Sequence, residues 1–455
     1  MNIILRFLMF AALLIAAPCE GDVAGLPFFK EGDRWCVVGD SITHDGSYHS
    51  LIYLYWATRH PDQRFTTINC GINGDYALRT LNRWNWDVFE RNPTIVSVLL
   101  GMNDVFRGLY APGSEGEAVE VKRKEALDQY SKSLTTAFEQ LKVKGAKVIL
   151  MSPSVYDDTA HFESPNNPGV NKALDICSQI VLTLAKQFGF SFVDIHTPMT
   201  ALNLKIQEKD PQATLVSRDR VHPGIPGHLV MAYYFLKAQG APAEIATIEL
   251  DARQQKVLHA SNCHIDLRKT STSEIAFDYH PQSLPFPVPE EAQFLLDGIP
   301  FIQDLNQERL KISGLDDGNY ELLINGQSIR TYPSAELDQG INLATEKTPA
   351  MEQAMKVAAF NKARSEKDQK LRGLIFVGNC VYPTGVPPNT DPEEIAKKYE
   401  EISRPWNSKY HQNQLEQYRL NKPREEEIRL EVEHLTDDMW KAAIPGKFQI
   451  EIRKK

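Results

Sequence analysis

Residues 34–43 read Arg-Trp-Cys-Val-Val-Gly-Asp-Ser-Ile-Thr and contain the pattern that decides the fold. The apolar run at the start is typical of a short buried β-strand, and Gly39-Asp40-Ser41 is typical of the turn after such a strand. A serine at the end of a buried strand is presented at the edge of the sheet, where its hydroxyl can act as a nucleophile. Gly-Asp-Ser is also common in plain turns, so further residues must decide between the two interpretations. The motif is not the Gly-x-Ser-x-Gly nucleophile elbow, because Thr43 stands at the second glycine position.

Four more apolar runs follow at intervals, with longer amphipathic stretches between them. The runs are Phe65–Asn69, Ile95–Leu100, Lys147–Met151 and Ser191–Ile195. The helical candidates are Tyr48–Arg59, Leu78–Phe89, Lys122–Lys144, Lys172–Phe188 and Gly227–Gln239. Strands that alternate with helices predict an α/β fold with a five-stranded parallel, doubly wound sheet and helices on both faces. Ligands bind such sheets beyond the carboxyl ends of the strands, so the residues after each run are the candidates for a site.

Glycine and polar residues follow three of these predicted strands. Residues 69–75 read Asn-Cys-Gly-Ile-Asn-Gly-Asp, and residues 101–104 read Gly-Met-Asn-Asp. Glycines let backbone N–H groups approach a substrate oxygen and an asparagine amide adds a neutral donor, so both segments suit an oxyanion hole. After the fifth strand, Asp219 and His222 are three residues apart, so the carboxylate can hold the imidazole Nδ1–H while Nε2 faces a serine. An isolated Asp-x-x-His pair is more often a surface pair, but its place behind the other segments favours catalysis.

These four segments, in this order and each at a strand end, resemble the SGNH (GDSL-type) hydrolase family. The resemblance covers about residues 30–242 and implies a flavodoxin-like three-layer fold and the activity of a carboxylic ester hydrolase. Carried over position by position, it implies Ser41 as the nucleophile and Asp219 and His222 as the rest of a catalytic triad. The implied oxyanion hole consists of Ser41, Gly74 and Asn103. The family's chemistry requires neither a metal nor an organic cofactor.

Two positions depart from the family pattern. Met102 replaces the glycine that is common before the asparagine, and Gly71 competes with Gly74 as the second-segment glycine. We prefer Gly74 because Asn-Gly-Asp matches the family's turn better. Among the other polar residues near these segments, His44 and Asp45 are expected to face solvent, and His228 is expected to start or pack a helix. The expected place of Trp84 and Trp86 is the core.

The second half of the chain changes its pattern after about residue 245. Residues 256–335 predict a small antiparallel β module, in which Asn325-Gly326 is a strong signal for a tight hairpin. Residues 340–455 predict two helical arms and a terminal edge strand that packs back. A loop at 378–392, around Asn379, joins the arms and is expected to cap the site. The resemblance extends to this half, since large family members from polysaccharide-degrading bacteria carry a similar extension.

The first 21 residues predict a signal peptide, because one basic residue precedes an apolar stretch that is too short to cross a bilayer. Pro18 before Cys19 argues against a lipoprotein, so the expected location is the periplasm or the exterior. The remaining five cysteines are too scattered for a disulfide framework, with at most a pair between Cys263 and Cys380. The 50 basic and 59 acidic residues give a net charge of −9, which argues against nucleic acid and anionic lipid as partners.

Export and the family resemblance together predict a function. They point to an exported serine esterase that removes short acyl groups, acetyl above all, from a carbohydrate. A lipase, an arylesterase and a thioesterase would use the same triad. A different class of function is a non-catalytic protein that binds a glycan or a partner on the hydrolase scaffold. The oligomeric state has no signature in the sequence.

Overall fold

The computed structural model describes residues 22–455, and the predicted signal peptide and Cys19 lie outside this range. Its first half is built on a parallel sheet with the strand order β2-β1-β3-β4-β5. The strands are β1 (Arg34–Gly39), β2 (Thr66–Gly71), β3 (Ile95–Leu99), β4 (Lys147–Met151) and β5 (Ser191–Val193). All four strand pairs are parallel, and β3 is buried along its whole length, which explains its continuous apolar sequence.

Helices on both faces of this sheet complete the three predicted layers. The helices α2 and α7 pack against each other, while α4 packs on α5. Their bounds are α2 (Ser47–Arg59), α4 (Glu117–Lys144), α5 (Val170–Phe188), α6 (His196–Gln207) and α7 (Ile225–Gln239). The predicted fold class is therefore confirmed. From β1 the chain first adds β2 on one side and then crosses to add β3 on the other side. This change in strand order places the topological switch point between β1 and β3, and sheets of this class bind their ligands at such a point.

The predicted helix Leu78–Phe89 is wrong as a single helix. The structure has a short α3 (Ala77–Thr80), a π-helical turn η1 (Trp84–Val88) and a 3-10 turn η2 (Phe89–Arg91). Arg83 lies between the first two, with a fully buried side chain that reaches the strand ends. The polar contacts of this one side chain interrupt the helix, and a hydrophobic pattern does not reveal them.

The predicted β module consists of two sheets, and it begins at Glu244 rather than at residue 256. The order of the first sheet is β13-β10-β6-β7, and that of the second is β12-β11-β14-β9-β8. The strands of the first are β6 (Glu244–Asp251), β7 (Lys256–Ser261), β10 (Gln307–Ser313) and β13 (Ile341–Asn342). Those of the second are β8 (Cys263–Thr270), β9 (Glu274–Pro281), β11 (Asn319–Ile324), β12 (Gln327–Pro333) and β14 (Phe448–Lys454).

Three details of the module bear on the sequence predictions. The Asn325-Gly326 hairpin is confirmed, with φ of 52° and 77° at its two residues. The pair β6 and β10 is parallel, so the module is not purely antiparallel. The terminal strand β14 pairs with both β9 and β11, so the expected edge strand is a central one. The shorter helical elements α8 (Phe301–Leu305), α9 (Ser334–Gln339) and η4 (Glu290–Asp297) connect the strands.

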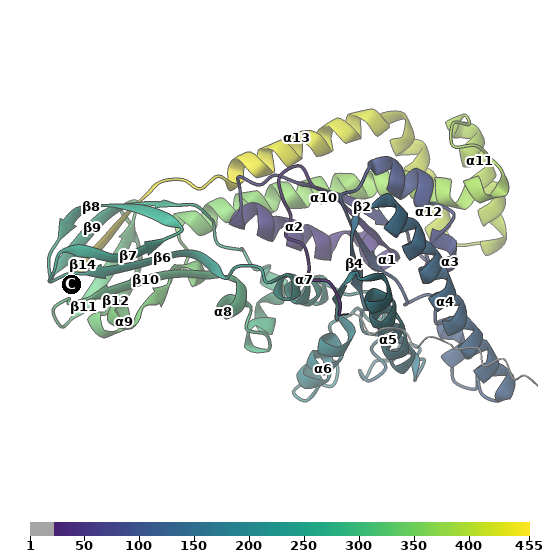
Figure 1. The fold of residues 1–455 in the computed structure, drawn as a ribbon, viewed down its shortest axis with the longest axis horizontal. Helices are drawn as coiled ribbons and strands as arrows, with labels where there is room; N and C mark the ends of the chain where they lie inside the picture. Colours follow the sequence, from purple (N-terminus) through teal and green to yellow (C-terminus); the bar gives the residue numbers. More distant parts are fainter. Residues whose placement is uncertain (1–21) are drawn as a thin grey trace, which may run out of the picture.

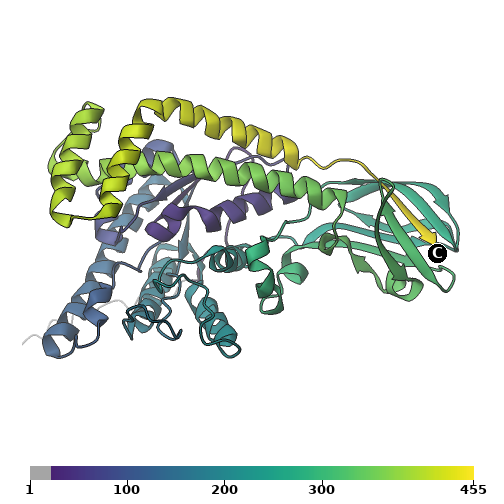
Figure 2. The ribbon, with the colours of Figure 1, turned by 180° about the vertical axis from the view of Figure 1, so that it is seen from behind.

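The C-terminal part of the chain forms four helices, of which the two longest run along the length of the molecule (Figure 1). The four helices are α10 (Pro349–Val381), α11 (Pro392–Ser403), α12 (Lys409–Asn421) and α13 (Glu425–Ala443). The sheets of the module lie at one end of the molecule and α11 and α12 at the other, while α10 and α13 pack side by side between them (Figures 1 and 2). The predicted second arm is three helices rather than one, because Pro405 and Pro423 interrupt it. Asn379 lies buried within α10, not in a loop.

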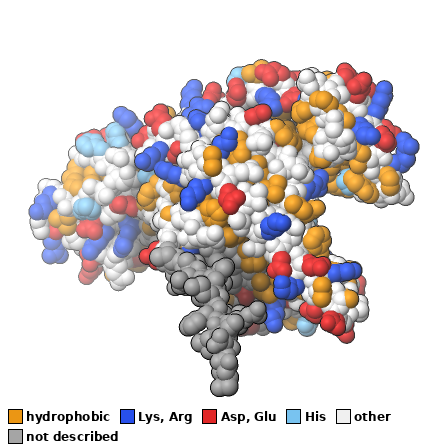
Figure 3. All heavy atoms as spheres, turned by 45° about the vertical axis from the view of Figure 1, so that its right-hand side comes forward, with side chains coloured by type: hydrophobic (Ala, Val, Ile, Leu, Met, Phe, Trp, Pro, Cys, Tyr) orange, Lys and Arg blue, Asp and Glu red, His pale blue; other side chains and the backbone are white. Residues whose placement is uncertain are grey.

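Three general properties of the described residues complete the fold. Acidic and basic side chains are interspersed on the face in Figure 3. No helix in residues 22–455 is both long and apolar enough to cross a membrane. The five cysteines of this range, including Cys263 and Cys380, are all free thiols.

Candidate active site

Ser41 lies at the carboxyl end of β1 and begins the short helix α1 (Ser41–Asp45). Asp40 caps this helix, since its Oδ1 accepts a 3.0 Å hydrogen bond from the backbone N–H of Ile42. Gly39 makes the turn possible: a Cβ there would lie 2.1 Å from Thr43 Oγ1 and 2.7 Å from the carbonyl oxygen of Leu99. The glycine and the cap therefore hold Ser41 at the switch point between β1 and β3.

The structure brings the three predicted triad residues together. Ser41 Oγ lies 2.7 Å from His222 Nε2, and His222 Nδ1 lies 2.5 Å from Asp219 Oδ2. The side chains of His222 and Asp219 are 46% and 48% exposed, so the pair sits at the mouth of the site. Burial favours a higher pKa for Asp219, but hydrogen bonds from Ser217, His222 and Val221 outweigh it and hold the pKa well below its ordinary value. The carboxylate is thus ionised and orients the imidazole as a general base requires.

Arg220, between Asp219 and Val221, anchors this turn to the rest of the fold. It is a non-glycine residue with a positive φ of 68°, and its guanidinium donates to the carbonyls of Asp157 and Ala160 at 2.9 and 3.1 Å. A buried arginine held in the left-handed region is a sign of a constrained functional turn. Arg220 lies inside the Asp-x-x-His motif, but nothing in the sequence marks it as buried or as left-handed.

Asn103 is held from both sides of its amide. Its Nδ2 donates to the carbonyl of Asp75 at 2.9 Å, and its Oδ1 accepts from Arg107 Nη1 at 3.0 Å. The pair of contacts fixes the amide orientation and leaves the second Nδ2 hydrogen for the cavity. Arg107 was missed by the sequence analysis, although its place four residues after Asn103 was a signal for a neighbour in space.

The two candidate glycines occupy different places. Gly74 lines the cavity, as the preferred assignment expects. Gly71 ends β2 in close contact with α1, where a Cβ would lie 2.2 Å from the backbone nitrogen of His44. Its carbonyl oxygen lies 3.2 Å from His44 Nδ1. The close packing at Gly71 accounts for that glycine without a role in binding.

Two buried carboxyl groups lie behind the site. Burial raises the pKa of Asp40 to about 6. Burial also raises the pKa of Asp104 to about 7, although Asp104 Oδ1 accepts a 2.7 Å hydrogen bond from the backbone of Ala77. In both residues burial favours the neutral form of the carboxyl group.

The cavity at Ser41 has a volume of about 500 Å³. Its lining residues are Ser41, Ile42, His44, Asp45, Asn73, Gly74, Asn103, Arg107, His222, Pro223, His228, Gln369 and Tyr410. A second cavity, of about 400 Å³, shares Asn103 and Arg107 with the first and is lined also by Phe106, Gly108 and Leu109. No group of three or more His, Cys, Asp or Glu within residues 22–455 is placed to hold a metal ion.

The structure also tests the expected places of five other residues near these segments. Asp45 is exposed and His228 is buried near the start of α7, as expected, and their side chains also form a pair at 3.2 Å. His44 is close to Gly71 and also lines the cavity. Trp84 is buried as predicted, whereas Trp86 is half-buried and packs on Tyr382.

Two residues of the C-terminal helices line the cavity more than 300 positions after Ser41. Gln369 on α10 donates from Nε2 to the carbonyl of Asp45, and Tyr410 on α12 accepts a 2.5 Å hydrogen bond from Asn73 Nδ2. These residues, and not the predicted loop around Asn379, form the C-terminal wall of the site. No local motif in the sequence marks either of them.

A serine, an imidazole and a carboxylate in this order, beside two donors at the end of a parallel sheet, define a serine hydrolase type of site. Comparisons with known proteins identify the family. A model of the GDSL-like Lipase/Acylhydrolase family matches residues 37–230. An acetylxylan esterase of Geobacillus stearothermophilus is 27% identical over 224 residues, which is 46% of this chain and 94% of the relative. A solved structure described as a gut microbial diltiazem-metabolizing enzyme is 30% identical and covers 95% of this chain and 99% of its own, with a TM-score of 0.87.

The chain therefore belongs to the SGNH (GDSL-like lipase/acylhydrolase) family. It is a carboxylic ester hydrolase, and the alternative of a non-catalytic scaffold is set aside. The structural match along nearly the whole chain extends to the module and the C-terminal helices.

Proposed function

We propose that the protein is an exported esterase that removes short acyl groups, acetyl above all, from carbohydrate esters, with Ser41 as its nucleophile. The observation that carries the catalytic part is the 2.7 Å contact between Ser41 Oγ and His222 Nε2 at the wall of the cavity. The acetylxylan esterase relative supports the acetyl and carbohydrate parts. The apolar stretch within residues 1–21 supports export, and cell fractionation followed by N-terminal sequencing tests it: protein found only in the cytoplasm, with an intact Met1, would contradict export.

The proposed reaction proceeds in two halves. His222 Nε2 removes the hydroxyl proton of Ser41 as its Oγ attacks the ester carbonyl, and the backbone N–H groups of Ser41 and Gly74 and the amide of Asn103 hold the oxyanion. His222 then protonates the leaving alcohol, and an acyl-serine remains. Water, deprotonated by the same imidazole, attacks this acyl-serine and releases the acid. Throughout, Asp219 stabilises the imidazolium.

Release of acetate from a panel of esters tests the substrate class. The panel contains acetylated xylan, mannan and pectin, 4-nitrophenyl esters of increasing acyl length, an acetyl thioester, and diltiazem, which carries an acetyl ester. We expect the highest kcat/KM on an acetylated saccharide and a steep fall as the acyl chain lengthens, because the polar side chains that line the cavity, such as Asn73, Arg107 and Gln369, suit sugar hydroxyl groups better than a long alkyl chain. A preference for long acyl chains or for the thioester would contradict the proposed substrate.

Tyr410 is expected to limit the size of the substrate, because its ring forms part of the wall contributed by α12. In Tyr410→Ala, we expect the ratio of kcat/KM for 1-naphthyl acetate to that for methyl acetate to rise about 5-fold, since space for one or two ring carbons changes binding on this scale. Steady-state kinetics on the two esters measure the ratio. Tyr410→Phe is the matched control: it keeps the ring, loses the hydrogen bond to Asn73 and should leave the ratio unchanged. An equal ratio in the alanine variant would show that Tyr410 does not select substrates.

A further inference from the structure

Four charged side chains are buried directly behind the ends of β1 and β2. They are Asp75 and Asp87, whose side chains are 0% exposed, with Arg83 at 0% and Arg372 at 4%. Three of them come from the segment after β2, but Arg372 comes from α10 in the C-terminal half. The family model ends at residue 230, so Arg372 lies outside the part of the chain that it describes.

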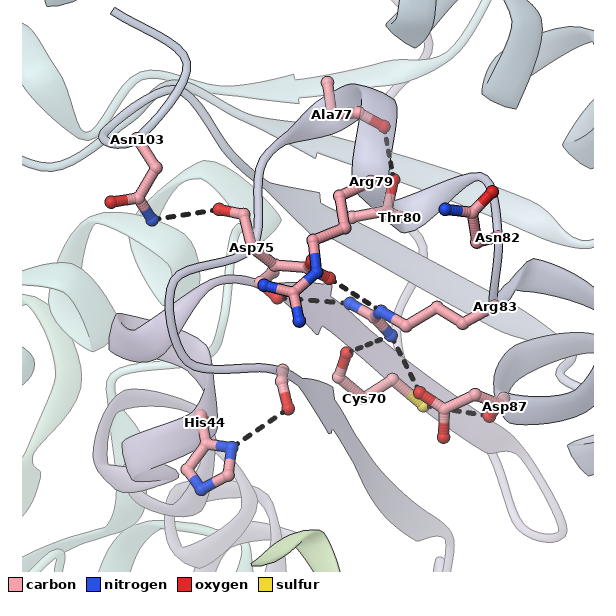
Figure 4. Close-up of polar contacts among 12 residues, drawn as sticks. His44, Cys70, Asp75, Ala77, Arg79, Thr80, Asn82, Arg83, Asp87 and Asn103 are labelled. Carbon is pink, nitrogen blue, oxygen red and sulfur yellow. Dashed lines mark hydrogen bonds and ion pairs between the residues drawn. The ribbon is translucent and has the colours of Figure 1, made fainter. Parts of the chain in front are cut away.

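The four groups alternate in sign and form one continuous chain of ion pairs. Arg372 Nη1 and Nη2 bind Asp87 Oδ1 and Oδ2 at 2.7 and 2.9 Å. Arg83 Nη1 binds Asp87 Oδ2 at 2.7 Å, and Arg83 Nε binds Asp75 Oδ2 at 2.7 Å (Figure 4). Burial favours a higher pKa for Asp87, but Arg372 and Arg83 lower it to about 2, so this carboxylate is ionised. Buried bidentate pairs of this kind hold their partners in one geometry.

The two guanidinium groups also bind the carbonyls at the ends of the strands. Arg83 donates to Cys70 at 2.8 Å and to Gly39 at 3.3 Å, and Arg372 Nε donates to Gly71 at 3.1 Å. Gly39 is two residues before Ser41, and Gly71 is three residues before Gly74. The same pairs therefore fix the backbone that leads into both turns of the proposed oxyanion hole.

The third donor of the hole depends on the same turn. Asn103 Nδ2 donates to the backbone carbonyl of Asp75 at 2.9 Å, and the carboxylate of Asp75 is held by Arg83 (Figure 4). A shift of Asp75 would move the partner of the Asn103 amide and the adjacent Gly74 together. An oxyanion hole stabilises charge only if its donors are already in place, so a small displacement has a large effect on the rate.

We propose that Arg372 of α10 is a positioning residue of the active site: through Asp87, Arg83 and Asp75 it holds Gly74 and Asn103 at the oxyanion. The proposal rests on the proposed function of the Ser41 site. It gives the C-terminal helices a part in catalysis that is separate from the wall formed by Tyr410 and Gln369. No contact between Arg372 and the substrate is involved.

Arg372→Met removes the guanidinium while it keeps an unbranched side chain of similar reach. We expect kcat for 4-nitrophenyl acetate to fall about 10- to 100-fold with KM changed less than about 3-fold, because donors are displaced while the rest of the cavity remains. Arg372→Lys keeps the positive charge but not the bidentate pair, so its kcat should lie between that of the parent and that of Arg372→Met. The matched control is Arg364→Met on the same helix. Arg364 is also buried, but its side chain bonds to Asn361 and lies over the ring of Tyr53, outside the chain of ion pairs. The kcat of Arg364→Met should therefore remain near that of the parent.

A double-mutant cycle with Asn103→Ala separates positioning from general loss of structure. If Arg372 acts through the oxyanion donors, Arg372→Met should lower kcat much less in the Asn103→Ala background than in the parent. Equal fold-losses in both backgrounds would overturn the proposal, as would a fall of the same size in Arg364→Met. If the methionine variant does not fold, Arg372→Lys completes the same cycle. A failure of the proposed function itself would be recognised separately, as full activity in Ser41→Ala.

Discussion

In Ser41→Ala we expect kcat for 4-nitrophenyl acetate to fall about 10⁴- to 10⁶-fold, with little change in KM. We assign the hydroxyl oxygen of Ser41 to attack the ester, and this oxygen is the only heavy atom that the substitution removes. The proposed donors at Gly74 and Asn103 remain, so residual hydrolysis by water should persist above the uncatalysed rate. Steady-state kinetics with the purified variant measure both values.

Ser328→Ala is the control for this prediction. Ser328 is exposed on β12, where its hydroxyl donates to Glu321, and β12 belongs to a different sheet from β1, which precedes Ser41. Its kcat should equal that of the parent. If Ser41→Ala retained more than about a tenth of the parent kcat, another group would have to supply the nucleophile.

The second large effect is expected for Asp219→Asn. The carboxylate accepts from His222 Nδ1 at 2.5 Å and from the backbone N–H of His222 at 3.0 Å. An amide at this place favours the imidazole tautomer with hydrogen on Nε2, which cannot accept the Ser41 proton. We expect kcat to fall about 10³- to 10⁴-fold, by analogy with the known effect of this change in a Ser-His-Asp triad.

Ser217→Ala is the matched comparison for Asp219→Asn, because it weakens the surroundings of the carboxylate without replacing it. It removes only the 2.6 Å hydrogen bond from the Ser217 hydroxyl to Asp219 Oδ1 and leaves the carboxylate ionisable. Its kcat should fall less than about 10-fold, the cost of one lost hydrogen bond. If the asparagine and alanine variants lost activity equally, the charge of Asp219 would not be the feature that matters.

The sequence predicted the parts of the site that lie close to strand ends. Ser41, Gly74 and Asn103 follow β1, β2 and β3, and parallel strands bring their carboxyl ends to one edge, so their proximity follows from the alternating pattern. The Asp-x-x-His spacing likewise predicted the contact between Asp219 and His222, and the structure confirms that contact. Their catalytic roles remain proposals.

The contribution of the C-terminal half was not predictable in the same way. Arg372, Gln369 and Tyr410 reach the site because α10 packs against α1, α2 and β2 and carries α12 with it. A contact across 300 residues has no local pattern in the sequence. Charged residues recur along most of α10, and nothing in the local sequence distinguishes the buried Arg372 from the others. The predicted cap around Asn379 was wrong because the helix continues to Val381 and buries that residue.

The segment after β2 illustrates a different limit. Its apolar residues have helical spacing, yet the chain breaks at Arg83 so that the guanidinium can bind Asp75, Asp87 and two strand carbonyls. Hydrophobic periodicity records which residues are buried among apolar neighbours. It does not record a buried charge whose partners come from its own segment and from the ends of β1 and β2.

Covalent labelling with a fluorophosphonate, read by intact-protein and peptide mass spectrometry, tests the central claim most directly. The reagent reacts with a serine only when a base and an oxyanion hole activate its hydroxyl. We predict a single adduct per chain, located at Ser41, and loss of esterase activity in proportion to labelling. An adduct at another serine, or full activity after complete labelling of Ser41, would contradict the assignment of Ser41, His222 and Asp219 as the catalytic triad.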